Sequence, residues 1–267
     1  MARESKARPG VLLQADLERV KAAFGVSDEQ VVRDHAISHL LAAISAMDGA
    51  QALTFIGGTA LSRTFLPGLR LSEDIDLMTS STRQATADAL QGAINRGLRR
   101  THGAVSWQPE LARTKGSESA VVRVGDRVLI RIQLLAERDY PRWPTTRRPL
   151  EQRYTDAPEA TLTTLTPSGF AASKTATWLE RRASRDLYDL WGLAQEGHIN
   201  AETSRLFTTL GPTGTPVAEW MFKEAPGDVE WQAALGHQGN VRVGPAEALS
   251  SVRSAWRAAV KADAGRA

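Results

Sequence analysis

Two carboxylates have the type and spacing that metal chemistry requires. Asp74 and Asp76 are separated by one residue. Because side chains alternate between the two faces of a strand, this spacing places both carboxylates on one face, and apolar Ile75 and Leu77 then point into a core. Carboxylate oxygens are the ligands that Mg²⁺ prefers in proteins. The pair therefore predicts a magnesium site.

A glycine turn lies upstream of the two aspartates. Gly57 and Gly58 follow an apolar run over residues 53–56, which predicts a buried strand, and precede a short segment that we expect to be helical. Glycine carries no Cβ, so the backbone can approach an anion closely. The N-terminus of the following helix would direct N–H groups and a positive dipole at that anion. Gly57, Gly58 and Thr59 are thus candidates to hold the β- and γ-phosphates of a nucleoside triphosphate (NTP).

Each motif alone has a more ordinary interpretation, since a Gly-Gly pair usually forms a turn and Asp-x-Asp on a surface strand is usually solvated. Together and in this order they resemble the polymerase-β-like nucleotidyltransferase superfamily, in which a Gly-Gly or Gly-Ser turn precedes Asp-x-Asp. GGTALSR over residues 57–63, followed by RLSEDIDL over residues 70–77, more narrowly resembles the AbiEii toxin family of abortive-infection and type IV toxin–antitoxin systems. The resemblance implies an α+β fold. A palm with a mixed sheet flanked by helices would occupy residues 1–150, and a mostly helical C-terminal lobe would occupy residues 151–267.

A third motif lies downstream, where residues 167–194 predict a helix, a break and a second helix. Lys174 followed by Arg185-Asp186 and Asp189 again resembles the toxin family. We expect Lys174 to contact a phosphate and offset charge in the transition state. Asp186 would accept a proton from the attacking hydroxyl or orient Lys174, and Asp189 would pair with Arg185 or with an arginine of the linker-like segment over residues 137–168. The ordinary alternative is a surface lysine and a helix ion pair.

The strand predicted over residues 128–135 bears on the metal site. In the superfamily this strand runs beside the Asp-x-Asp strand and often carries a third acidic residue. Here Arg131 and Gln133 hold the outward positions. The resemblance therefore implies that Arg131 faces the triphosphate. Gln133 cannot act as a charged ligand, so we expect Asp74 and Asp76 to hold the metal without a third carboxylate.

Two further residues near the motifs are candidates for nucleotide binding. Arg63 ends the GGTALSR segment and would supply positive charge to the phosphates. Ser72 lies two residues before Asp74, so on a continuing strand it would share the carboxylate face. A phosphate on Ser72 would add about two negative charges there and repel an incoming triphosphate.

Periodicity predicts the remaining elements. Helices are expected over residues 11–24, 27–47, 82–101, 201–210, 215–223, 228–235 and 245–262, with a hairpin turn over residues 124–127. Residues 137–168 contain five prolines and many arginines interleaved with aromatics, which predicts linker-like chain that either contacts single-stranded nucleic acid or simply connects the lobes.

The bulk composition narrows the class of protein. The chain has 267 residues, 42% of them hydrophobic, which suffices for one large or two joined domains. It contains no cysteine and no apolar run long enough to cross a membrane, so we expect a cytoplasmic protein with no membrane partner. Its net charge is +3 and arginine greatly outnumbers lysine, which fits a polyanionic partner or a GC-rich genome.

These observations predict a Mg²⁺-dependent nucleotidyltransferase. The family resemblance implies an RNA acceptor such as the tRNA 3′ end, inhibition of growth and a cognate antitoxin protein. Two alternatives stay open. A small-molecule (antibiotic) nucleotidyltransferase would need an acidic pocket for a cationic drug, and a non-catalytic nucleotide- or RNA-binding module would be favoured by Gln133.

Overall fold

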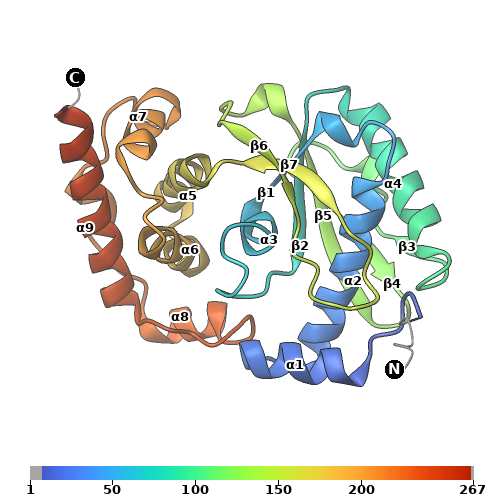
Figure 1. Cartoon of the computed structure of the whole chain (residues 1–267). Coiled ribbons are helices and arrows are strands. Elements are labelled where there is room, and N and C mark those ends of the chain that lie inside the picture. Colours follow the sequence, from blue (N-terminus) through green and yellow to red (C-terminus); the bar gives the residue numbers. More distant parts are fainter. Residues whose placement is uncertain (1–7, 266–267) are drawn as a thin grey trace, which may run out of the picture. The chain divides into compact units, whose positions relative to one another are not determined.

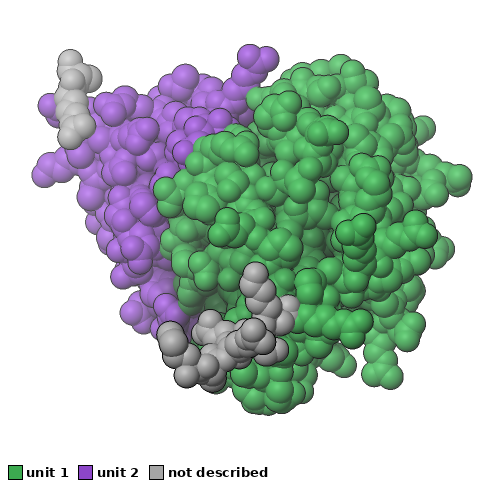
Figure 2. All heavy atoms as spheres, turned by 45° about the vertical axis from the view of Figure 1, so that its right-hand side comes forward, with its two compact units in different colours: residues 1–140, 147–164 green, residues 141–146, 165–267 purple. Residues whose placement is uncertain are grey.

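The computed structural model describes residues 8–265 and divides the chain into two compact units. Unit 1 comprises residues 1–140 and 147–164, and unit 2 comprises residues 141–146 and 165–267 (Figure 2). The chain passes from the first unit to the second for the last time after residue 164. Figure 1 labels the helices and strands of both units.

Within residues 8–265 the chain builds a seven-stranded sheet in the order β3-β4-β5-β2-β1-β7-β6. Its strands are β1 (Leu53–Ile56), β2 (Asp74–Thr79), β3 (Ser106–Trp107), β4 (Ser119–Val124), β5 (Val128–Ala136), β6 (Thr145–Pro149) and β7 (Thr161–Leu165). The sheet is mixed, because β2 is antiparallel to β1 and parallel to β5. The predicted strand over residues 53–56 and the hairpin between β4 and β5 are confirmed.

The helices of unit 1 are α1 (Gln14–Phe24), α2 (Asp28–Ser45), α3 (Gly57–Ser62) and α4 (Arg83–Leu98), with short 3-10 turns η1 (Ala50–Ala52), η2 (Leu111–Arg113) and η3 (Glu137–Asp139). They match the predicted helices to within a few residues. Gly25 ends α1 in the left-handed conformation at φ 67°, and the Ser27 hydroxyl accepts a hydrogen bond from the Gln30 amide at the start of α2. Helices α2 and α4 pack against each other and against β5 (Figure 1).

The expectation of linker-like chain over residues 137–168 was wrong in part. Strands β6 and β7 lie in this segment, and β7 pairs in parallel with β1. The β-branched sequence of β7, TLTTL, favours a strand. Its pairing partner is distant in sequence, and the surrounding prolines concealed the pattern.

Unit 2 is helical, as predicted. It contains α5 (Pro167–Arg181), α6 (Ser184–Gln195), α7 (Ala201–Leu210), η4 (Glu219–Phe222), α8 (Asp228–Leu235) and α9 (Pro245–Ala264). Helix α5 begins at a Thr166 cap with Pro167 in its first turn, and α7 begins with a capping box at Asn200. The core includes the fully buried side chains of Trp178, Trp231 and Trp256.

Within residues 8–265, no helix combines the length and the apolar character needed to cross a membrane.

Candidate active site

The two aspartates lie on one face of β2, as their spacing predicts. Asp74 and Asp76 are half-buried, whereas Ile75 and Leu77 between and after them are fully buried. Strand β1 runs antiparallel to β2 and places Ile56 opposite Asp76. The residue after Ile56 is Gly57, so the pairing of β1 with β2 places the glycine turn beside the carboxylates.

Gly57 is in direct contact with one of these carboxylates. It has φ +79°, a conformation that L side chains rarely adopt. A Cβ at Gly57 would lie 2.2 Å from Asp76 Oδ2. Both the backbone conformation and the space therefore require glycine at this position.

Gly58 faces a different pair of side chains. A Cβ at Gly58 would lie 2.6 Å from Arg70 Nη2 and 3.2 Å from Ser72 Oγ. Arg70 is buried, and its Nη1 donates to the carbonyl of Leu71 at 3.1 Å. Sequence reasoning missed Arg70, because its approach to Gly58 depends on the path of the loop between α3 and β2.

Thr59 joins the glycine turn to the aspartate strand. Its buried hydroxyl donates a hydrogen bond to the carbonyl of Asp74. The contact of Thr59 with phosphate stays a prediction, and the observed bond gives the Thr59 hydroxyl a positioning role. Helix α3 has six residues, in agreement with the short helical segment expected after the glycine turn.

Strand β5 runs beside β2 and places Arg131 next to Asp74 and Gln133 next to Asp76, as predicted. Register partners on neighbouring strands point to the same face. Arg131 is exposed, which puts an accessible guanidinium on the carboxylate face. Gln133 Nε2 donates to the carbonyl of Ser117.

The donor set fits a magnesium ion. Two accessible carboxylates on one face provide hard oxygen ligands, and the absence of a side chain at Gly57 lets the Asp76 carboxylate lie directly against the glycine turn. Asp74 and Asp76 would hold the ion. Gln133, the register partner of Asp76, adds no third carboxylate.

The expectation that Arg63 supplies positive charge to the phosphates is wrong. Its side chain is fully buried, and Nη2 lies 2.7 Å from Asp34 Oδ1. Its Nη1 donates to Ser38 Oγ and to the Glu151 carbonyl. Burial lowers the pKa of Arg63 to about 10, against the opposing effect of Asp34. This arginine joins α2 to the end of α3, so we no longer assign it to the nucleotide.

Ser72 also differs from the expectation. Strand β2 begins at Asp74, so Ser72 precedes the strand rather than continuing it. Its side chain is nearly buried, and its Oγ faces the Gly58 backbone. Ser72 therefore borders the glycine turn, but a modifying enzyme would reach its hydroxyl only after local opening.

Lys174, Asp186 and Asp189 form a buried cluster in unit 2. Lys174 Nζ lies 3.0 Å from Asp186 Oδ1 and 2.7 Å from Asp189 Oδ2. Asp189 thus pairs with Lys174, rather than only with an arginine as expected. Arg181 Nε donates to Asp186 Oδ2 at 2.7 Å.

These partners decide between the two roles expected of Asp186. Burial alone would raise the pKa of Asp186, but Lys174 and Arg181 lower it to about 2. A carboxylate with so low a pKa is a weak base at neutral pH. The geometry thus favours the orienting role over proton acceptance.

A cavity in unit 1 lies at the far end of β2 from the aspartates. It has a volume of about 740 Å³ and begins at Thr79, the last residue of β2. Thr79 lies three residues beyond Asp76 and five beyond Asp74, which corresponds to roughly 10 Å and 16 Å along a strand. Arg113, Lys115 and Arg138 line this cavity and are exposed. Its basic lining suits a polyanion rather than a metal.

The chain is similar to known proteins over most of its length. Residues 39–251 match the family model described as "Nucleotidyl transferase AbiEii toxin, Type IV TA system". Among solved structures, the chain is similar to MenT4, a nucleotidyltransferase toxin from Mycobacterium tuberculosis H37Rv, with 20% identity and a TM-score of 0.67 over 96% of this chain and 92% of that chain. It is also similar to a candidate nucleotidyltransferase from H. pylori, with 13% identity and a TM-score of 0.57 over 91% of this chain and 99% of that chain. No curated protein sequence matches significantly. At these identities, the two structural similarities establish the fold.

Proposed function

Because the chain belongs to the AbiEii nucleotidyltransferase toxin family of type IV toxin–antitoxin systems, we propose that it is a Mg²⁺-dependent enzyme that transfers nucleotides from an NTP to an RNA acceptor. The acceptor that the family resemblance favours is the 3′ end of a tRNA. Extension or capping of that end would block aminoacylation, translation and growth, and an antitoxin protein would counter the effect.

One observation carries the proposal. The Asp76 carboxylate occupies the space that a Cβ at Gly57 would need, 2.2 Å from that position. The backbone at the turn and the metal-binding group are thus in contact. A triphosphate whose oxygens bind both the turn and the metal requires this proximity.

The residues of unit 1 have separable tasks. When bound, Mg²⁺ would act as a Lewis acid that neutralises phosphate charge. Asp74 and Asp76 would hold it, and the backbone at Gly57 and Gly58 would approach the phosphates. Arg131 adds positive charge on the same face. These groups align the α-phosphorus for in-line attack by an acceptor hydroxyl, with pyrophosphate as the leaving group.

The basic cavity beside η2 supports an RNA acceptor over a cationic drug. Arg113, Lys115 and Arg138 are exposed around it, whereas a pocket for a cationic drug would be acidic. Phosphate contacts of this kind weaken as salt rises. We therefore expect transfer to RNA to fall steeply with ionic strength, more so than transfer to an uncharged acceptor.

The test is incubation of the protein with Mg²⁺, each labelled NTP in turn and total RNA. We expect label on RNA, and sequencing of the labelled species would identify the acceptor. Asp76→Asn and Asp74→Asn should each abolish labelling while leaving the thermal midpoint within a few degrees of the wild type. Asp126→Asn, on the exposed hairpin turn between β4 and β5, is the matched control and should label normally.

Three results would contradict the proposal. Label on a small acceptor alone would indicate an antibiotic-modifying enzyme. Nucleotide binding without any transfer would indicate a binding module. Equal labelling by Asp76→Asn and the wild type would exclude the aspartate pair as the metal site. Induced expression in a bacterial host, with Asp76→Asn as the comparison, tests for growth inhibition.

A further inference from the structure

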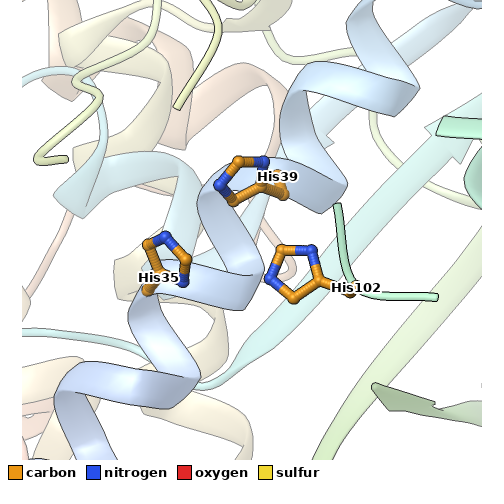
Figure 3. Close-up of side chains that lie close together, drawn as sticks. All are labelled: His35, His39 and His102. Atoms are coloured by element: carbon orange, nitrogen blue, oxygen red, sulfur yellow. The ribbon is translucent and has the colours of Figure 1, made fainter. Parts of the chain in front are cut away.

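Three of the chain's five histidines lie together in unit 1, apart from the aspartate pair on β2. His35 and His39 are one helical turn apart on α2, and His102 follows α4 (Figure 3). One ring nitrogen from each lies within 4.8 Å of the other two. The ring centroids are 4.7 to 5.6 Å apart. The three imidazoles therefore converge on one point.

Asp156 adds an oxygen to this cluster. His35 Nε2 lies 3.0 Å from Asp156 Oδ1, and His39 Nε2 lies 3.0 Å from Asp156 Oδ2. The Asp156 side chain is fully buried, and its Oδ2 also accepts a hydrogen bond from the Gly10 amide at 2.8 Å. A buried carboxylate is costly unless a positive charge or several hydrogen bonds compensate for it.

The hydrogen bonds around the cluster show which ring nitrogens are available as ligands. An imidazole binds a metal through one ring nitrogen, and the partner of the other nitrogen orients the ring. Thr101 Oγ1 lies 2.9 Å from His102 Nδ1 and orients the ring, which leaves His102 Nε2 as its candidate ligand atom.

We propose that His35, His39, His102 and Asp156 bind one divalent transition-metal ion, with Zn²⁺ as the best match to this donor set. Three imidazole nitrogens and one carboxylate oxygen form a four-ligand zinc site. In a tetrahedral zinc site, ligand atoms are about 3.3 Å apart. The His35 and His39 nitrogens, each 3.0 Å from an Asp156 oxygen, already approach this value, whereas the separation of up to 4.8 Å among the histidine nitrogens would shorten on metal binding.

The four ligands make the site structural rather than catalytic, because no position stays open for a substrate. The ion would join α2, the end of α4 and the segment that carries Asp156. The Gly10 amide attaches the N-terminal region to the same carboxylate. Metal binding would therefore fasten several parts of unit 1 that are far apart in sequence.

The cluster also connects to the proposed active site. The His35 ring packs edge-on against Tyr154 at 5.0 Å, and Tyr154 OH donates to Asp34 Oδ2 at 3.0 Å. Asp34 in turn binds Arg63, the residue that caps the end of α3. Because α3 begins with the glycine turn, loss of the ion should loosen the wall of the nucleotide site without removing any of its ligands.

The competing interpretation is that the histidines only donate hydrogen bonds to Asp156. A direct test uses tag-free protein that has been treated with a chelator, exchanged into metal-free buffer without Mg²⁺ or NTP, and titrated with Co²⁺. We expect visible d–d absorption that saturates at one Co²⁺ per chain and is abolished by Zn²⁺. Zn²⁺ should also raise the thermal midpoint of the wild-type protein.

Two variants and a control locate the site. His102→Asn removes the ligand that does not contact Asp156, and we expect its affinity to fall by at least about 100-fold, beyond the effect of losing a supporting residue. Asp156→Asn tests the oxygen ligand in the same way. His198→Asn is the matched control, because His198 is also half-buried but lies in unit 2, and it should bind Co²⁺ like the wild type.

The outcomes are decisive without any activity measurement. Failure of the wild-type protein to bind Co²⁺ or Zn²⁺ would overturn the proposal and leave a hydrogen-bonded histidine cluster. Equal binding by His102→Asn and the wild type, with both folded by circular dichroism, would also overturn it. Since the titration contains no NTP, either result leaves the transferase proposal untouched.

Discussion

Substitution of Gly57 by alanine tests the geometry of the active site most sharply. Gly57 has φ +79°, and the new Cβ would lie 2.2 Å from Asp76 Oδ2. An ordinary van der Waals contact begins at 3.4 Å. The carboxylate must therefore withdraw by about 1.2 Å, or the turn must move by the same amount.

The substitution should affect stability and activity to different degrees. The left-handed conformation costs a non-glycine residue about 1–2 kcal/mol, so we expect the free energy of unfolding to fall by at least that amount. A displacement of about 1 Å between reacting groups can cost about 100-fold in rate. We therefore expect RNA labelling to fall by roughly 100-fold or more in folded Gly57→Ala protein.

Gly49→Ala is the matched control. Gly49 has φ +86° but nothing within 4 Å of its Cβ position. It should lose a similar 1–2 kcal/mol from backbone strain while keeping its labelling rate. Urea unfolding measures the first quantity and initial rates with saturating labelled NTP measure the second. If Gly57→Ala were no slower than Gly49→Ala, the contact between the turn and Asp76 would have no role in transfer.

Three further predictions concern residues whose surroundings the structure revealed. Lys174→Ala removes the cation that Asp186 and Asp189 share, although Arg181 still pairs with Asp186, so the free energy of unfolding in urea should fall by about 3 kcal/mol, the low end for breaking a buried ion pair; an unchanged midpoint with lost activity would instead make Lys174 a purely catalytic group. The folded pKa of Asp186 is about 2, below its ordinary 3.8, so the unfolded state binds more protons between these values and about 2 kcal/mol of stability should disappear as the pH falls from 4 to 2. Asp186→Asn should flatten that part of the urea pH profile, and an unchanged slope would argue against the low pKa. Ser72→Glu should lower labelling far more than Ser72→Ala, because Ser72 Oγ borders Gly58; equal rates would remove Ser72 from the site.

Local sequence patterns were sufficient for much of the fold. The alternation of polar and apolar residues around Asp74 and Asp76 predicted which side chains face the core, because successive side chains of a strand point to opposite faces. Helical spacing similarly located α2, α4 and most of unit 2. The position of Arg131 and Gln133 beside the aspartates followed from the family resemblance, and the register of β5 with β2 bears it out.

Other features required the tertiary structure, because they depend on partners that are distant in sequence. The position of Arg63 after the glycine turn predicted a phosphate ligand, but its side chain is fully buried against Asp34 on α2. The prolines around β7 suggested a linker, although its partner β1 lies about a hundred residues earlier. His35 is distant in sequence from His102 and Asp156, and only folding brings the three side chains together.

The sequence by itself therefore determined the chemistry that we propose for residues 57–77. The glycine turn and the two aspartates are close in the chain, and their residue types dictate what they can bind. Only the tertiary structure decided which charged groups are available to help them. Burial and pairing commit Arg63 and Lys174 to carboxylates, whereas Arg131 stays exposed on the carboxylate face. The physical reason is that the sequence specifies which side chains are charged, whereas packing decides which of these side chains are desolvated and which groups they pair with.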